Sequence, residues 1–398
     1  MSWARRGRPV TRRQGRLPPG RLAWVPLWLL ACGGSEPQKV EDTGEIPELL
    51  TYAVGHSAFT VVDPERGDRA LLVDVWYPSA ADPEAVTPTT AYPLAAGIDL
   101  PSELAVEGAA VAAGGPHPLL VFSHGYQGIH TQSVELMEAL AQHGFVVAAP
   151  EHTGNTQSDP SDPFDVAAAH RVPDVSLVID AMSARSADED DALAGAVDPE
   201  RVGVLGHSFG GMTALGAVAG WAGVGPDPRV LAALPISAVI DGDLQRDDRD
   251  GANAGFDAAG LAEVTRPVML MGGTEDVAVP VENNALAFDW LTGAPVVYQV
   301  DIIGANHTHF ANVCDIGELL LELGVAIEDW EALGAGALVE PYTDTCTGDA
   351  FPIEEATRLQ NLYAVAFFRQ QLLDEADYGW WLTAEAAEIE EAVSLWAR

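Results

Sequence analysis

Basic residues are scarce in this chain. It holds 20 Lys and Arg against 59 Asp and Glu, a formal net charge of −39, and Lys39 is its single lysine. Such a charge repels the phosphate backbone of nucleic acids, so we expect neither DNA nor RNA as a partner. A neutral or cationic small molecule meets no such repulsion, although charge alone does not select one. We interpret the acidity as that of a solvated surface.

Long apolar runs are also scarce. One run covers residues 22–31 and is roughly ten residues long, which is too short to span a bilayer, and no second long apolar segment follows it. An arginine-rich leader without acidic residues precedes this run. A basic region followed by a short apolar region is how an export signal is built. The sequence therefore predicts a signal peptide over residues 1–31 and a mature chain that does not span the membrane.

The apolar run ends in a short motif that resembles a bacterial lipobox, Leu29-Leu30-Ala31-Cys32. The resemblance implies that Cys32 is lipidated as the first residue of the mature protein. The protein would then be exported and held at a membrane of the cell envelope, such as the outer membrane, by this lipid anchor. Residues 32–49 would form a polar tether. The alternative is an ordinary secretory signal, in which Cys32 has no role and the protein is secreted.

Cysteine is rare, with three in the whole chain. Besides Cys32, the chain has Cys314 and Cys346, both in the C-terminal region. An even pair in an oxidising compartment predicts a disulfide, which would add about 3–4 kcal/mol of stability in the chain-entropy model. Two free buried thiols are the alternative.

Short apolar runs alternate with helical patterns along the chain. We expect strands over residues 51–62, 71–77, 118–123, 145–149, 201–206, 231–239, 267–272 and 296–303, and helices over 131–143, 172–185, 209–222, 282–291 and 354–373. The first two strands should pair antiparallel, and the later ones indicate a mainly parallel sheet with helices on both faces. Residues 79–118 should be loop with a short helix. The sequence thus predicts one α/β domain over residues 50–398, with a C-terminal insertion and helix.

A serine flanked by glycines lies where a predicted strand meets a predicted helix, in the sequence Gly206-His207-Ser208-Phe209-Gly210-Gly211. A serine on such a tight turn projects its hydroxyl clear of the sheet, and the glycines avoid clashes of a Cβ in that turn. A chance match is the alternative. The strand–turn–helix context favours Ser208 as a catalytic nucleophile.

A serine nucleophile needs a histidine base and a carboxylate that orients the base. His307 comes at the first turn after the strand predicted over 296–303, and His309 is its competitor. Asp276 follows the strand over 267–272, and Asp241, which follows the strand over 231–239, is the alternative acid. The histidine pair lacks a third ligand with matching spacing, so we expect neither a metal nor a cofactor.

The reaction also needs an oxyanion hole of fixed hydrogen-bond donors. The backbone N–H of Phe209 is one donor by its position directly after the nucleophile. The segment 122–128 follows an earlier strand, and Tyr126 is the candidate for the second donor. A strand-exit loop without catalytic role is the alternative.

With these segments in view, the chain resembles bacterial members of the α/β-hydrolase superfamily related to platelet-activating-factor acetylhydrolases and dienelactone-hydrolase-like esterases. The resemblance covers roughly residues 50–310 and rests on Val73-Asp74-Val75-Trp76-Tyr77-Pro78, His124-Gly125, Ala149-Pro150-Glu151-His152 and 206–211. It implies the α/β-hydrolase fold and ester cleavage. Dienelactone hydrolases use a cysteine nucleophile, and the acetylhydrolases place their acid where Asp241 lies. The Asp276 loop and the turn at 304–307 look more like the cutinase and polyester-hydrolase branch.

These observations predict a serine hydrolase that cleaves carboxylic esters of lipid, short-acyl or polyester type through an acyl-Ser208 intermediate. An exported serine peptidase is one alternative, because the same triad cleaves amides. An inactive, lipid-anchored binding protein of the same fold is the other.

Overall fold

The computed structural model describes residues 52–95, 97–244 and 255–398. The signal peptide predicted over residues 1–31, the lipidated Cys32 and the tether over 32–49 lie outside the described residues.

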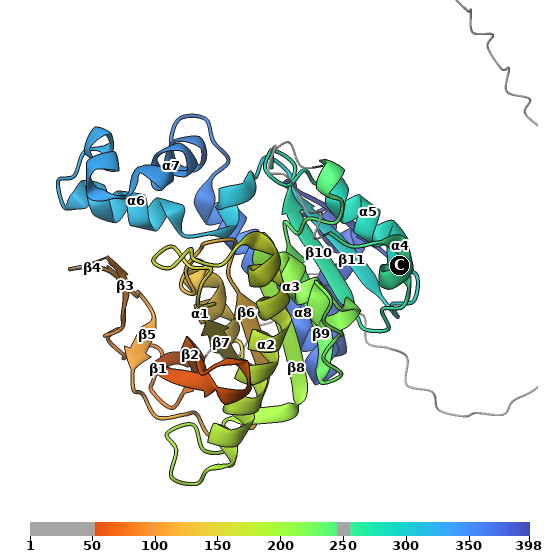
Figure 1. Cartoon of the computed structure of the whole chain (residues 1–398), viewed down its shortest axis with the longest axis horizontal. Helices are drawn as coiled ribbons and strands as arrows, with labels where there is room; N and C mark the ends of the chain where they lie inside the picture. The colour runs from red at the N-terminus through yellow and green to blue at the C-terminus, as the bar shows by residue number, and fades with distance from the viewer. Residues whose placement is uncertain (1–51, 96, 245–254) are drawn as a thin grey trace, which may run out of the picture. The chain divides into compact units, whose positions relative to one another are not determined.

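A sheet with its strands in the order β12-β11-β10-β9-β8-β6-β7-β2-β1-β5 forms the centre of the fold (Figure 1). The strands from β7 to β11 in this order pair parallel. Antiparallel pairs join β2 to β7, β1 to β2 and β12 to β11, and the short strand β5 pairs parallel with β1. The bounds are β1 Ala53–Asp63, β2 Arg69–Ser79, β5 Ala105–Glu107, β6 His117–Ser123, β7 Val146–Pro150, β8 Val197–His207, β9 Val230–Ile236, β10 Val268–Gly273, β11 Val297–Ile302 and β12 Val393–Ala397. The predicted fold class, with a mainly parallel sheet, is confirmed.

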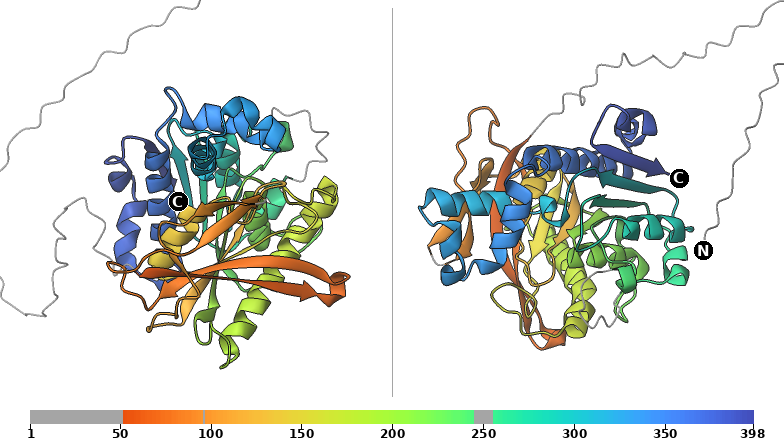
Figure 2. Two further views of the ribbon diagram at one scale, coloured as in Figure 1. Left: turned by 90° about the vertical axis from the view of Figure 1, so that its left-hand side faces the viewer. Right: turned by 90° about the horizontal axis from the view of Figure 1, so that it is seen from above.

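Helices cover both faces of this sheet (Figures 1 and 2). One face packs against α2 Phe164–Ala187, α3 Phe209–Ala219, α4 Ala258–Ala262 and α5 Glu282–Trp290, and the other against α1 Val134–Gln142 and α8 Ile353–Leu373. Because both faces are covered, strands such as β6 and β10 are buried along their whole length and are rich in apolar residues. None of the helices within the described ranges is both long and apolar enough to cross a bilayer.

The stretch 79–118 differs from the prediction of loop with a short helix. It forms the hairpin of β3 Ala91–Ala95 and β4 Ile98–Pro101 together with β5, and its described residues form no helix. Tertiary contacts hold the hairpin: the indole N–H of Trp76 donates to the Tyr92 hydroxyl at 2.7 Å, and that hydroxyl donates to Glu138 at 2.6 Å. Such distant partners leave no periodic signal in the local sequence.

The C-terminal insertion predicted from residue 312 contains α6 Val313–Glu322 and α7 Val339–Cys346, joined by short 3-10 turns. We call residues 313–346 the cap. A disulfide joins Cys314 to Cys346 at its two ends, with their Cα atoms 5.5 Å apart. Leu320, Trp330 and Tyr342 form a small apolar core of its own. Figure 1 shows the cap beside the β3-β4 hairpin.

After the cap, α9 Ala384–Ala387 precedes β12, the final strand, which the sequence pattern did not predict. β12 pairs antiparallel with β11 over five residue pairs and covers the edge of the sheet. Its pairing partner lies about a hundred residues earlier in the chain, beyond the reach of local periodicity.

Candidate active site

Ser208 lies on a sharp turn between β8 and α3. Its backbone has φ 59° and ψ −118°, a conformation that residues with a Cβ rarely adopt. The surrounding packing requires glycine, because a Cβ on Gly210 would lie 1.7 Å from the carbonyl oxygen of Ser123, and one on Gly206 would lie 2.5 Å from that of Gly210. The turn therefore holds Ser208 in a strained conformation at the wall of a cavity that its side chain helps to line.

His307 and Asp276 form a hydrogen-bonded pair at the same cavity. The Nδ1 atom of His307 lies 2.7 Å from Oδ2 of Asp276. The other carboxylate oxygen, Oδ1, accepts the N–H groups of Ala278 at 2.9 Å and Val279 at 2.7 Å. Burial by itself raises the pKa of Asp276. The hydrogen bond and charge of His307 and the N–H of Val279 lower the pKa by more than burial raises it, so the net pKa is below its usual value. Asp276 is thus a buried carboxylate that stays ionised beside His307.

The pair reaches the cavity through the ring of His307. Since Nδ1 faces Asp276, Nε2 is the nitrogen left for proton transfer, and both His307 and Ser208 line the cavity. Within the described part of the chain, Ser208 Oγ has no hydrogen-bond partner. Hydrogen bonds between a nucleophile and its base often close only when substrate is bound.

Asp241, the alternative acid, is engaged elsewhere. Its Oδ1 accepts the N–H of Asp243 at 2.9 Å, and its own N–H donates to Oδ1 of Asn283 at 3.1 Å. No hydrogen bond or ion pair joins it to a histidine among the described residues. Its geometry is that of a turn-capping aspartate.

His309, the alternative base, uses both ring nitrogens for local structure. Its Nδ1 accepts the N–H of Asn306 at 2.9 Å, and its Nε2 donates to the carbonyl of Phe351 at 3.0 Å. With 2% of its surface exposed, the side chain has no free nitrogen to face Ser208. The structure therefore brings His307, and not His309, to the cavity that Ser208 lines.

Tyr126 and Phe209 are the residues from which the sequence predicts the oxyanion-hole donors. Both line the cavity, Phe209 as the first residue of α3 and Tyr126 in the loop after β6. The structure gives neither backbone N–H a hydrogen-bond partner among the residues it describes. The two aromatic rings also touch, with centroids 5.3 Å apart. Two unpaired N–H groups, one of them at a helix N-terminus, can stabilise a developing negative charge.

Gln132 is a site residue that the sequence analysis missed. Its Oε1 accepts the N–H of Gly125 at 2.8 Å, and its Nε2 donates to Nδ1 of His207 at 3.0 Å. It therefore ties the loop that carries Tyr126 to the turn that carries Ser208. A polar residue near the start of a predicted helix gave no signal of this role.

The cavity that these residues line measures about 870 Å³. None of the described residues that line it is Asp, Glu, Lys or Arg, although the chain carries a net charge of −39. The cap contributes an apolar wall, with Ile316, Leu320 and Leu338 among its members, and the β3-β4 hairpin contributes Leu94 and Ile98. Nor do the described residues contain any group of three or more His, Cys, Asp or Glu that could hold a metal ion.

Comparisons with known proteins agree with the observed fold. A family described as serine aminopeptidase, S33, matches residues 114–232, which include the Tyr126 loop and the Ser208 turn. Among solved structures, the chain is similar to a ferulic acid esterase from Streptomyces cinnamoneus, with 25% identity and a TM-score of 0.58 over 83% of this chain and 93% of that one. A comparison with curated proteins found no match. The sheet, the family match and this neighbour together show that the chain is a hydrolase of the α/β-hydrolase fold.

Proposed function

We propose that this protein hydrolyses neutral carboxylic esters with a sizeable apolar part, through an acyl-Ser208 intermediate. The observation that carries the proposal is the meeting of Ser208, the His307–Asp276 pair and the N–H groups of Phe209 and Tyr126 at one cavity, whose described lining carries no Asp, Glu, Lys or Arg. Each part has a place in ester cleavage by a serine nucleophile.

In the acylation step, Nε2 of His307 takes the proton of Ser208 as Oγ attacks the ester carbonyl carbon. Negative charge develops on the carbonyl oxygen, which the N–H groups of Phe209 and Tyr126 stabilise. The tetrahedral intermediate collapses, the carbon–oxygen bond to the alcohol breaks, and the leaving alkoxide takes the proton from His307. Asp276 keeps the Nδ1–H of His307 in place and stabilises its positive charge throughout.

In the deacylation step, water takes the place of the alcohol. His307 removes a proton from water, the hydroxide attacks the acyl carbon, and Ser208 leaves with the proton returned by His307. The products are a carboxylic acid and regenerated serine.

The cavity favours an uncharged, apolar substrate. Burying an unpaired charge against its walls would be costly, since the described lining offers no charged side chain to pair with it. The apolar residues of the cap and hairpin instead gain by covering an acyl chain or a ring. The similarity to a ferulic acid esterase is compatible with an ester of an aromatic acid, which is one class that the cavity would admit.

A second candidate is an aminopeptidase, which the match to the serine aminopeptidase family supports. Such an enzyme recognises the substrate's terminal ammonium group, which a carboxylate binds well. The described lining of the cavity contains no Asp or Glu, so an ester fits it better than a peptide with a free amino terminus. Turnover of aminoacyl p-nitroanilides with no turnover of esters would reverse this preference.

We also propose that the enzyme acts outside the cytoplasm, anchored by a lipid on Cys32. This proposal rests on the leader, the apolar run and the lipobox-like motif of the sequence. Incorporation of radiolabelled palmitate into the expressed protein, and its loss in Cys32→Ser, would support it. Equal labelling of the two forms would contradict it.

The first test is the hydrolysis of p-nitrophenyl esters from acetate to palmitate by the wild-type protein and by Ser208→Ala. We expect turnover by the wild type, with acyl chains longer than acetate preferred, and loss of that turnover in the variant. A fluorophosphonate probe should label the wild type alone. Full activity in Ser208→Ala would rule out the mechanism, and a folded wild type that neither turns over nor takes the label would point to an inactive binding protein.

A further inference from the structure

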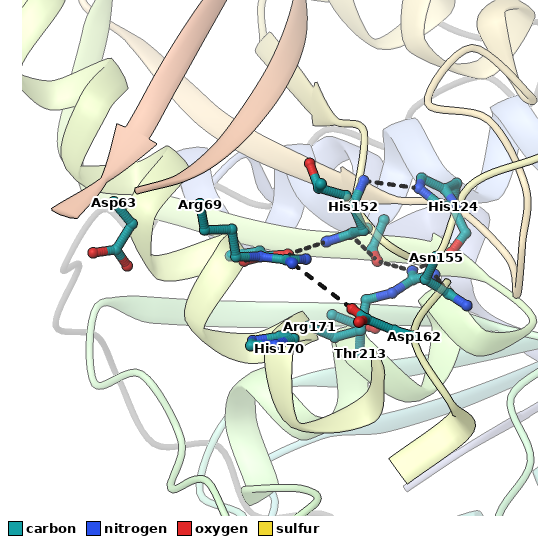
Figure 3. Close-up of polar contacts among 12 residues, drawn as sticks. Asp63, Arg69, His124, His152, Asn155, Asp162, His170, Arg171 and Thr213 are labelled. Carbon is teal, nitrogen blue, oxygen red and sulfur yellow. Dashed lines mark hydrogen bonds and ion pairs between the residues drawn. The ribbon is translucent and has the colours of Figure 1, made fainter. Parts of the chain in front are cut away.

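Arg171 of α2 is a buried cation that contacts the loop after β6. Its side chain has 0% of its surface exposed and lies within a polar network that includes His124, His152 and Asn155 (Figure 3). One guanidinium nitrogen, Nη1, donates to the carbonyl of His124. The other, Nη2, donates to the carbonyl of Gly125 at 3.1 Å and to the side-chain oxygen of Asn155. Arg171 thus binds two successive backbone carbonyls just before Tyr126.

The carbonyl of Gly125 is held from three sides. Besides Arg171, it accepts from Nδ1 of His124 at 2.8 Å and from the N–H of Gly128 at 3.2 Å. The N–H of His152 donates to Nε2 of His124 at 3.1 Å, so the ring proton of His124 is on Nδ1 and points to Gly125. Burial lowers the pKa of His124, which keeps the ring neutral in this tautomer.

The hydrogen bonds to the Gly125 carbonyl determine the direction of the Tyr126 N–H. The Gly125 carbonyl and the Tyr126 N–H belong to one planar trans peptide unit, in which the two groups point in opposite directions. A carbonyl bound toward Arg171 therefore turns the Tyr126 N–H away from Arg171. Rotation of this peptide unit would exchange a donor for an acceptor in the proposed oxyanion hole.

The same guanidinium touches the residue that supplies the other donor. Its central carbon lies 4.7 Å from the ring centroid of Phe209, above the ring face. Arg171 is the side chain that binds the peptide before Tyr126 and also packs on Phe209. Arg171 also donates to the hydroxyl of Ser123 at 3.1 Å, at the end of β6, so its guanidinium contacts both halves of the proposed oxyanion hole and the strand before one of them.

The negative charge of Asp174 stabilises the protonated form of Arg171. Asp174 lies one turn after Arg171 on α2, is itself fully buried, and pairs with Arg69 and His152 at 2.8 and 2.9 Å. Burial lowers the pKa of Arg171 to about 9, and the charge of Asp174 opposes that decrease. Arg171 therefore stays protonated at neutral pH, with its charge offset by Asp174 and by the carbonyl dipoles.

We propose that Arg171 is a positioning residue of the oxyanion hole, which orients the Tyr126 N–H through the Gly125 carbonyl and supports Phe209 through its ring. The inference rests on the proposed ester hydrolysis at Ser208 and adds to it a residue that does not itself touch the substrate. Lysine cannot replace it, because one ammonium lacks the planar fork that reaches both carbonyls and Asn155.

The test compares the wild type with Arg171→Lys and Arg171→Met on p-nitrophenyl butyrate. We expect kcat to fall by about 10²–10³, the loss known for removal of one oxyanion-hole donor, while KM changes by less than about threefold. Phenylboronic acid forms a tetrahedral adduct on serine, so its affinity should fall with kcat. The matched control is Arg69→Lys, which alters the same network without contacting the loop and should keep the wild-type kcat.

Asn155→Ala serves as a milder variant if replacement of Arg171 prevents folding. It removes one acceptor of the guanidinium but leaves the cation in place, and we expect a smaller fall in kcat at constant KM. A kcat within twofold of the wild type in a folded Arg171 variant would overturn the inference, and so would the same result in Asn155→Ala if neither Arg171 variant folds. A loss that appears equally in KM would also overturn it. Absence of Ser208-dependent turnover in the wild type would instead refute the proposed function.

Discussion

Nδ1 of His307 and Oδ2 of Asp276 lie 2.7 Å apart, and the two residues follow neighbouring parallel strands, β11 and β10. Because these strands end at the same edge of the sheet, their following loops meet there. Asp241 follows β9, the next strand, yet its carboxylate binds the N–H of Asp243 within its own loop. The loop after β11 therefore meets the loop after β10, and this contact pairs His307 with Asp276 as the base and acid of the proposed triad.

Replacement of Asp276 by asparagine should lower kcat by about 10⁴, because the amide cannot hold the Nδ1–H tautomer of His307. The measurement is kcat on p-nitrophenyl butyrate at pH 7.5. Asp241→Asn is the matched control and should keep kcat within a fewfold of the wild type. The reverse result, a large loss in Asp241→Asn alone, would return the acid role to Asp241.

Replacement of His307 by alanine should abolish Ser208-dependent turnover, since His307 is the cavity histidine that pairs with a carboxylate in the proposed triad. His309→Gln should instead retain most of kcat and lower the thermal unfolding midpoint, because it disturbs the hydrogen bonds to Asn306 and Phe351. Each such bond contributes about 1 kcal/mol. Differential scanning calorimetry and steady-state kinetics on both variants separate the two roles.

The disulfide between Cys314 and Cys346 should matter most for large substrates. It closes a loop with a sequence separation of 32, which in the chain-entropy model contributes about 4 kcal/mol. The double variant Cys314→Ser/Cys346→Ser should unfold its cap more readily and lose its apolar wall, including Leu320. We expect a larger fall in kcat/KM for octanoate than for acetate esters. Equal losses on both esters would show that the cap does not bind the acyl chain.

Asp74 on β2 makes stability depend on acid pH. Burial by itself raises its pKa, but hydrogen bonds from His130 and His56 lower the pKa to about 2. A carboxyl with a lowered folded-state pKa stabilises the fold above its unfolded pKa of about 4, and that stabilisation is lost as the pH falls through the folded value. The contribution amounts to about 2 kcal/mol.

The measurement for Asp74 is the unfolding free energy of the wild type and Asp74→Asn in urea between pH 7 and pH 2. The wild type should be more stable at pH 5–7, and the difference should shrink as the pH falls from about 4 to 2. Glu65→Gln, at an exposed position, serves as the control for replacement of an acid by its amide. A constant difference across this range would mean that Asp74 keeps its ordinary pKa.

Much of the fold could be predicted from the sequence because its signals are local. The uniformly apolar runs at β6, β7 and β8 indicate strands covered on both faces, and the structure forms strands there. The helix predicted over 172–185 starts eight residues later than α2, which begins at Phe164. Residue Pro173 lies inside that helix and interrupts the helical pattern of the sequence.

The sequence by itself determined the turn that carries Ser208, because the glycines that a strand–turn–helix elbow needs lie beside the serine in the chain. The choice of Asp276 over Asp241, and of His307 over His309, required the tertiary structure, since each pair fits the same local pattern. Gln132 and Arg171 have no local sequence signature for a different reason: their hydrogen-bond partners His207 and Gly125 lie 75 and 46 positions away in the chain. Periodicity reports the burial of a segment, whereas the pairing of loops depends on strand order and register, which only the folded chain brings about.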